Sequence, residues 1–248
     1  MYAARLTRGP VALAFTDRHG GVSVAPFDSL NLAWAGGDEL TAMEENHRRV
    51  MADFSPGSGL DSLAQLSQVH GNDVAEVGPE GPAHDVHGHL HAVGDGLVTT
   101  QPGVSLMVRA ADCVPVLFAD QTGGVIGAAH CGRLGLVAGI VPATVAAMRD
   151  LGAVGLTAWV GPSICGRCYE VPEQMRDDVA AVEPDSWSTT SWGTPSVDVA
   201  AGVRAQLGRD DVDVVDLSAC TRESSDLFSY RRDGPASGRQ AGIIRIAS

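Results

Sequence analysis

The segment Ser105–Gly135, SLMVRAADCVPVLFADQTGGVIGAAHCGRLG, decides the fold because it is built almost wholly from short apolar runs. Short apolar runs bounded by Gly, Pro or Asp are typical of buried strands. Cys113 lies between the first run and the second, and His130 ends the third. Both residues therefore stand at strand ends, where their side chains can converge. The three runs cover residues 104–108, 114–118 and 125–130.

His70, in Ser67-Gln-Val-His-Gly-Asn-Asp73, is the third candidate ligand, at the exit of a predicted strand. Two imidazoles and one thiolate with an open fourth position are typical of a catalytic zinc rather than a structural one. Nearby glycines allow close approach of a ligand, and Asp112 offers a supporting carboxylate. The competing interpretation is structural, because buried Cys and hydrogen-bonded His are common in protein cores. The long, irregular separations also match no short zinc-finger pattern.

Composition excludes several classes of protein. The chain has 248 residues with a net charge of −13, and its 17 basic residues are all arginine. An acidic protein without a basic run is poorly suited to bind nucleic acid or an anionic membrane surface. The length suits one large domain, and no linker divides it, so we predict a single domain over residues 1–248.

The chain shows neither a membrane-spanning stretch nor a secretory leader. No run of about 18 apolar residues is present, and the first 17 residues lack the pattern of a signal peptide. A cytoplasmic location is the resulting expectation. The five cysteines are an odd number, and a cytoplasmic chain keeps its thiols reduced, so no disulfide framework is predicted.

The order of predicted elements favours an α+β fold, because no regular alternation of strands and helices spans the chain. Thr41 and Glu44 form a capping-box pattern before a helix over 42–54. Pro142 is expected to kink the helix over 136–151 or to mark its start, and residues 186–195 read as a polar loop. Further strands are predicted at 11–15, 63–69, 97–100, 157–160, 212–217 and 241–246, and further helices at 172–182 and 199–207.

Two other groups of metal-capable residues are weaker candidates. His84, His87, His89 and His91 form a tract of the kind that binds metal loosely, and we interpret it as an exposed insertion without a catalytic role. Cys165 and Cys168 form a Cys-x-x-Cys pair, but no second pair follows to complete a zinc site. That pair is therefore predicted to be incidental.

Several phrases of the chain resemble the bacterial polyphenol-oxidase or laccase-domain family. The resemblance runs in order along essentially the whole chain, and six separate phrases agree, which makes it specific. The phrases are Arg18-His-Gly-Gly-Val-Ser23, Gln68-Val-His-Gly71, Ala111-Asp-Cys-Val-Pro115, Ala129-His130 with Gly132, Gly161-Pro162 with Tyr169-Glu-Val171, and Phe228-Ser-Tyr-Arg-Arg232 with Gly238-Arg239.

The resemblance implies a four-layer α/β/β/α domain with two mixed sheets, similar to a toxin deamidase. It implies a zinc site at His70, Cys113 and His130, with copper as the alternative metal, and a catalytic role for these three residues and Asp95. The implied activities are phosphorolysis of adenosine, inosine and methylthioadenosine, and deamination of adenosine. A His/Cys zinc set resembles that of nucleobase deaminases, in which the zinc activates a water.

Phosphorolysis also needs an anion site, for which guanidinium groups are suited because they bind phosphate bidentately. The candidates are Arg18, Asn46, Arg48 and Arg231, and Asp95 or Asp112 is the candidate to protonate or orient the base. The chain departs from the family twice. Arg133 and Leu134 stand where the family has Trp and Arg, and His47 replaces an Arg after Glu45-Asn46.

Two further classes stay open from the sequence. A copper-dependent polyphenol oxidase is disfavoured, because multi-copper oxidation needs many His ligands and few lie outside the 84–91 tract. A hydrolase that uses Cys113 as nucleophile and a His as base is the other, acting in peptidoglycan-precursor editing as the family resemblance implies. Metal content separates these classes, because metal ligation and nucleophilic attack compete for the same sulfur. The oligomeric state is not indicated.

Overall fold

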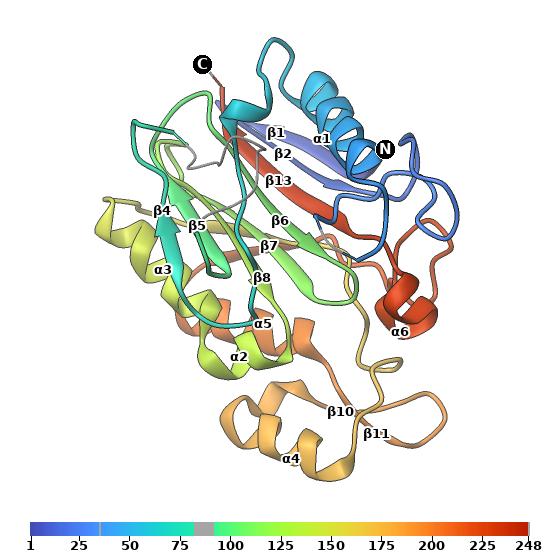
Figure 1. Ribbon diagram of the computed structural model, residues 1–248. Coiled ribbons are helices and arrows are strands. Elements are labelled where there is room, and N and C mark those ends of the chain that lie inside the picture. The colour runs from blue at the N-terminus through green and yellow to red at the C-terminus, as the bar shows by residue number, and fades with distance from the viewer. Residues whose placement is uncertain (35, 82–91, 248) are drawn as a thin grey trace.

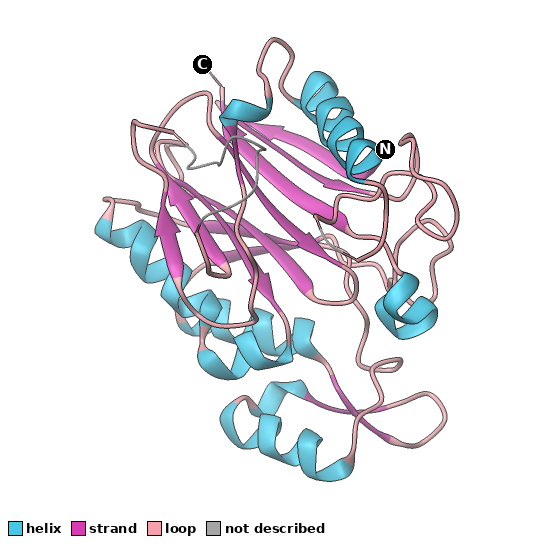
Figure 2. Cartoon of the chain, viewed as in Figure 1, coloured by secondary structure: helices cyan, strands magenta, loops and turns pink. Residues whose placement is uncertain are grey.

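The computed structural model describes residues 1–34, 36–81 and 92–247, which form two large β-sheets flanked by helices and one two-stranded sheet (Figures 1 and 2). The strands are β1 Tyr2–Arg8, β2 Val11–Thr16, β3 Leu63–Ala64, β4 Val74–Glu76, β5 Gly96–Thr99, β6 Ser105–Ala110, β7 Val114–Ala119, β8 Ile126–Cys131, β9 Thr157–Val160, β10 Trp187–Thr189, β11 Pro195–Val197, β12 Asp213–Asp216 and β13 Gln240–Ile246. The helices are α1 Leu40–Phe54, α2 Arg133–Ala138, α3 Ile140–Asp150, α4 Glu173–Val182, α5 Val199–Arg209 and α6 Tyr230–Asp233, with short 3₁₀ turns at Leu60–Ser62, Pro184–Ser186 and Gly234–Ala236.

Both large sheets are mixed. The first has the order β1-β2-β13-β6-β3, and only its last pair, β6 with β3, is parallel. The second has the order β12-β9-β7-β8-β5-β4, with parallel pairs at both edges and antiparallel pairs between them. The predicted α+β class with two mixed sheets is therefore confirmed.

The segment 105–135 links the two sheets. Its first strand, β6, belongs to the five-stranded sheet, whereas β7 and β8 are neighbours in the six-stranded sheet. One apolar cluster, with members from β2, β6 and β13 on one side and β5, β7 and β8 on the other, fills the space between the sheets. Because the strands of this segment are buried on both faces, they read as continuous apolar runs in the sequence.

Helices cover the outer faces of the sheets. Helix α1 packs on the five-stranded sheet through Val50, Met51 and Phe54. Helices α3 and α5 cover the six-stranded sheet in a separate apolar cluster (Figure 1). Helix α4 with the β10–β11 hairpin forms a protrusion beside α2 and α5 in Figure 2. The likeness to a toxin deamidase and the single-domain organisation over 1–248 stay predictions.

Helix boundaries differ from the prediction in two places. Helix α1 begins at Leu40, and its N-cap residue is Glu39, whose side chain makes no capping hydrogen bond. Thr41 lies inside the helix rather than at its N-cap, so the predicted capping box is wrong. The predicted helix over 136–151 is two helices, α2 and α3, separated by Gly139 with φ 82°. Glycine adopts this left-handed conformation without a steric penalty, and Pro142 falls in the first turn of α3.

Strand predictions were wrong where side chains are polar or pairing is short. The predicted loop over 186–195 contains strand β10 and leads into β11, which pair antiparallel. The predicted strand 63–69 is regular only over Leu63–Ala64, and the chain then leaves the sheet toward His70. Strand β1 was not predicted, because as an edge strand it is largely exposed.

Two further expectations concern the surface. The tract from His84 to His91 lies outside the described residues. In the described part of the chain, no helix is both long and apolar enough to cross a membrane.

Candidate metal centre and cavity

His70, Cys113 and His130 come together at the edge where the chain passes from one sheet to the other. Cys113 lies in the turn between β6 and β7, His130 in β8 opposite Pro115, and His70 in the loop between β3 and β4. One donor atom from each of the three lies within 4.8 Å of the others. Cys113 Sγ is 3.6 Å from His70 Nε2, and the two imidazole centroids are 4.9 Å apart. The predicted convergence of these side chains is confirmed.

Asp95 holds two of the three candidate ligands in place. Its carboxylate is fully buried and accepts a hydrogen bond from His130 Nδ1 at 2.8 Å. It also accepts from the backbone N–H groups of Val69, His70 and Gly71, at 3.2, 3.0 and 2.7 Å. A histidine ligand typically donates its second ring N–H to a carboxylate, which fixes the tautomer and the ring orientation. Asp95 thus leaves Nε2 of His130 free to bind a cation.

Unusual backbone conformations mark both sides of the site. His70 has φ 63° and Asp112 has φ 87°, in the left-handed region that non-glycine residues seldom adopt. The Asp112 carboxylate accepts hydrogen bonds from Thr221 Oγ1 and from the Arg231 backbone N–H, both at 2.6 Å. These bonds hold the turn that presents Cys113, which is how strained conformations persist at functional sites.

Gly132 leaves the space that the ligand atoms occupy. A Cβ on this residue would lie 2.6 Å from His70 Cδ2 and 2.9 Å from Cys113 Sγ. Its φ of −86° is open to any residue, so the absence of a side chain serves packing rather than backbone freedom. The predicted role of nearby glycines, close approach of the ligands, fits this geometry.

The protonation states suit a soft cation. Burial and the neighbouring Asp112 raise the pKa of Cys113 to about 12, so without a cation the thiol stays protonated at neutral pH. Burial lowers the pKa of His130 despite the opposing hydrogen bond to Asp95, so its imidazole is neutral and able to bind. Burial opposes ionisation of Asp95, but the His130 ring and the Gly71 and His70 N–H groups lower its pKa. Two imidazoles and a thiol that ionises on binding fit zinc or copper.

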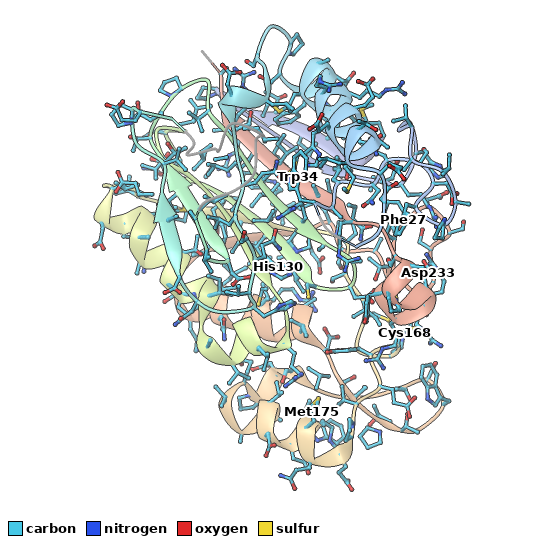
Figure 3. All side chains as sticks on the ribbon, in the orientation of Figure 1. Phe27, Trp34, His130, Cys168, Met175 and Asp233 are labelled. Carbon is cyan, nitrogen blue, oxygen red and sulfur yellow. The ribbon has the colours of Figure 1, made fainter. Side chains whose placement is uncertain are left out.

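The three residues open into a cavity of about 570 Å³. Figure 3 labels His130 near the centre of the molecule and Trp34 above it, toward the five-stranded sheet; both line this cavity. Aromatic rings and guanidinium groups dominate the rest of the wall. Its lining includes Trp34, Gln68, Arg109, Asp112, Ile164, Tyr169, Tyr230, Arg231 and Arg239.

Three arginines on this wall bond to backbone carbonyls rather than to carboxylates. Arg109, Arg231 and Arg239 donate to backbone carbonyls of Leu66, Glu170, and Ser237 with Gly238. Within the described residues, no carboxylate forms an ion pair with any of the three. Burial, and then the charge of Arg239, lower the pKa of Arg109 to about 10, so both groups stay charged at neutral pH. Charged groups that repel one another across a cavity favour an anion between them.

The structure places the other predicted phosphate contacts away from this wall. Arg18 donates to the Asp28 carbonyl and lies over the Phe228 ring, and Arg48 pairs with Glu44 and Glu45 on the surface of α1. Asn46 is fully buried and bonds to the 22–31 segment, which it holds against α1. Of the four candidates, only Arg231 lines the cavity. Sequence reasoning missed Arg109, although a charged residue inside an apolar strand is itself a signal.

The structure also shows where the residues lie that differ from the pattern of the resembled family. Leu134 is exposed on α2, and Arg133 begins that helix; neither lines the cavity. His47 is buried and stacks on Trp34, with ring centroids 4.2 Å apart and an interplanar angle of 15°. Its Nδ1 donates to the Met43 carbonyl at 2.8 Å. His47 therefore supports an aromatic wall of the cavity from behind.

His47 makes stability depend on pH. Burial lowers its pKa from 6.5 to about 4, so the unfolded chain takes up the proton first as the pH falls. The free energy of unfolding should drop through this window by about 3 kcal/mol and then level off. In His47→Phe, which keeps a ring on Trp34, the His47 part of this drop should be lost and the part due to His130, whose pKa burial also lowers, should remain, as measured by urea unfolding between pH 7 and 4. His19→Gln, at an exposed histidine, is the control and should retain the wild-type drop; equal curves for all three proteins would contradict the prediction.

The cysteine pair has partners that the sequence did not suggest. Cys165, Cys168, Cys220 and Glu223 each offer a donor atom within 4.8 Å of the others. The sequence indicated no second donor pair, but Cys220 and Glu223, distant in the sequence, complete the group. That the pair is incidental stays a prediction.

Comparison with known proteins identifies the family. A family model described as multi-copper polyphenol oxidoreductase laccase matches residues 12–247. The chain belongs to this family. The laccase-domain resemblance drawn from six sequence phrases is thus confirmed.

Relatives in this laccase family cover nearly the whole chain. A Streptomyces coelicolor protein named purine nucleoside phosphorylase is 50% identical over 250 residues, covering 98% of this chain and 99% of that protein. A Streptomyces griseus protein of the same name is 51% identical, covering 95% and 94%. Among solved structures, the Bacillus licheniformis hypothetical protein YfiH matches with a TM-score of 0.84 at 28% identity, covering 96% of this chain and 93% of that one.

Proposed function

We propose that this protein is a zinc-dependent purine nucleoside phosphorylase that also deaminates adenosine. One observation carries the proposal: a soft His–Cys–His set opens into the same cavity as three arginines that form no ion pair with a carboxylate of the described residues. The names of the Streptomyces relatives support the phosphorolysis. The substrates are adenosine, inosine or methylthioadenosine together with inorganic phosphate.

In the proposed reaction, a phosphate oxygen attacks C1′ of the ribose while the bond from C1′ to the purine nitrogen breaks. The products are ribose 1-phosphate and the free base, which takes up a proton. Arg231, Arg239 and Arg109 hold the phosphate and offset the net charge of −13 that otherwise repels it. The rings of Trp34, Tyr169 and Tyr230 offer faces on which a purine stacks.

The residues present fit zinc at His70, Cys113 and His130, because the donors are soft, converge within 4.8 Å and have an open cavity side. When bound, zinc supplies Lewis-acid chemistry and activates water for deamination, in which water replaces the amino group and ammonia leaves. Asp95 acts as a positioning residue, because it is fully buried against His130. Asp112 bonds to Thr221 and to the Arg231 backbone, which orients the phosphate-binding wall.

Two alternatives from the sequence are less well supported. Multi-copper oxidation needs many His ligands, and the candidate metal groups in the described residues contain only two histidines, both in one set. A hydrolase acting through Cys113 needs a thiolate, but burial raises the pKa of this thiol to about 12. A bound cation would ionise this thiol, and that cation would then occupy the sulfur.

The arginine wall is tested by separating the two activities. Arg239→Ala should raise the KM for phosphate about 10- to 100-fold, which corresponds to the free energy of one lost charge-assisted hydrogen bond. Adenosine deamination without phosphate should change less than about threefold, because it needs water rather than an anion. Chromatography of adenine and inosine formed from adenosine, with and without phosphate, measures both activities.

Arg48→Ala serves as the matched control, since its guanidinium pairs with Glu44 and Glu45 on the surface. We expect wild-type phosphorolysis from this variant. An equal loss in both arginine variants would instead favour the phosphate contact on α1 that the sequence suggested. Unchanged phosphate dependence in Arg239→Ala would contradict the proposed anion site.

A further inference from the structure

A second group of metal-capable side chains lies outside the cavity. It consists of Cys165, Cys168, Cys220 and Glu223, whose donor atoms lie within 4.8 Å of one another. Figure 3 labels Cys168 beside α6 and Asp233, well apart from His130. Cys168 is buried, Cys165 and Cys220 are partly exposed, and Glu223 faces solvent. The donors of this second group are three sulfurs and a carboxylate, and it contains no histidine.

Two turns of equal spacing build this group. Cys165-Gly-Arg-Cys168 and Cys220-Thr-Arg-Glu223 each place two donors three positions apart. The first turn is closed by the Cys168 N–H donating to the Cys165 carbonyl at 2.9 Å. The second is closed by the Ser224 N–H donating to the Cys220 carbonyl at 3.0 Å. Paired two-donor turns of this spacing are typical of four-coordinate zinc sites.

The sheet holds the two turns together. The two turns follow β9 and β12, which are parallel neighbours, so both segments leave the sheet at the carboxyl ends of these strands. The pairing continues past the strands as a parallel bridge between Ser163 and Cys220. The Cys165 N–H also points at Cys220 Sγ, 3.5 Å away. Backbone N–H groups directed at sulfur stabilise thiolate ligands, so the backbone is arranged for a metal before one binds.

We propose that Cys165, Cys168, Cys220 and Glu223 bind a zinc ion in a closed, structural site. Four protein donors leave no open position for substrate, which distinguishes it from the His70–Cys113–His130 set. Binding displaces the thiol protons to solvent, including the one that Cys168 donates to Glu223 at 3.4 Å. The Arg222 guanidinium, which stacks on Trp192 at 4.9 Å, adjoins the anionic site and offsets its charge.

The proposed zinc would fix the wall of the cavity. Ile164 and Tyr169, which flank the first turn, line the cavity. Thr221, inside the second turn, donates to Asp112 beside Cys113. A cation that joins the two turns therefore stabilises the segments that carry these contacts, without touching the reacting atoms.

Metal content of intact, reduced protein tests the proposal. Wild type loaded with ZnCl₂ and desalted should hold about two zinc ions per chain, and Cys168→Ser and Cys220→Ser should each hold about one, by mass spectrometry of the metal. Cys113→Ala should also hold about one zinc ion per chain, because it loses the ion of the His70–Cys113–His130 set and keeps the ion of the second group. Cys131→Ala removes a buried thiol outside both groups and should keep both ions.

A measurement on wild type covers the case in which a variant fails to fold. With zinc, Cys165 and Cys220 should resist alkylation, and after chelation both should be labelled, as read by peptide mass mapping. Equal labelling in the two states would overturn the proposal, as would wild-type zinc content in Cys168→Ser and Cys220→Ser. A disulfide among the three cysteines in protein kept under reductant would also overturn it.

Discussion

Cys113→Ala is expected to lower kcat/KM for inosine phosphorolysis and adenosine deamination by at least about 10³-fold, together with the loss of one zinc. Cys113 is the only ligand in the His70–Cys113–His130 set that can become an anion, and without it two imidazoles remain. Both activities should fall together, unlike in the arginine variant. The measurements are product chromatography and metal content of the same preparation.

Cys131→Ala is the matched control, because this neighbouring thiol is buried in the core and is not a member of the ligand set. It should retain zinc and most of the activity. If Cys113→Ala lost activity but kept its full metal content, Cys113 would be a nucleophile rather than a ligand. Wild type that forms no nucleoside product but turns over a peptidoglycan precursor would instead support the cell-wall alternative.

Gly132→Ala is expected to reduce zinc affinity and both activities by about 10²-fold or more while the protein stays folded. The added Cβ would lie 2.6 Å from His70 and 2.9 Å from Cys113 Sγ, so one of the two must move. His70 is exposed on a loop, so its side chain can move away from the added methyl group without disturbing the fold. That movement would separate His70 from Cys113 and His130. Competition with a chromophoric chelator measures the affinity, and circular dichroism checks folding.

Gly208→Ala controls for the added methyl group, because a Cβ at that position of α5 meets no atom within 4 Å. It should keep wild-type affinity and gain slightly in stability, since alanine favours a helix over glycine. Unchanged zinc affinity in Gly132→Ala would show that the cation does not bind between His70 and Cys113.

The sequence predicted best what local patterns encode. The strands β6, β7 and β8 are buried on both faces, and their apolar runs predicted them within about one or two residues. Their ends also indicated that Cys113 and His130 would converge. Strand β1 escaped prediction because it is an edge strand whose side chains are mostly exposed, which blurs the alternation on which such predictions depend.

Contacts between distant segments could not be predicted in the same way. Arg239 reaches the cavity from the start of β13, and only the sheet order brings it toward Arg109 on β6. Cys220 joins Cys165 because β9 and β12 are neighbours, a pairing that no local spacing reveals. Arg18 and Arg48 were plausible phosphate contacts by residue type, but nearby carboxylates already engage both.

The hydrogen bonds of the Asp95 carboxylate connect two separate segments of the His70–Cys113–His130 site. It is the common anchor of the 69–71 loop and of the imidazole on β8, so the positions of both depend on this one side chain. One carboxylate thus holds both the backbone of His70 and the ring of His130, although the two residues come from separate segments of the chain. Asp95 contacts His70 through its backbone N–H, so the exposed His70 imidazole can still turn about its side-chain torsions while the His130 ring is fixed.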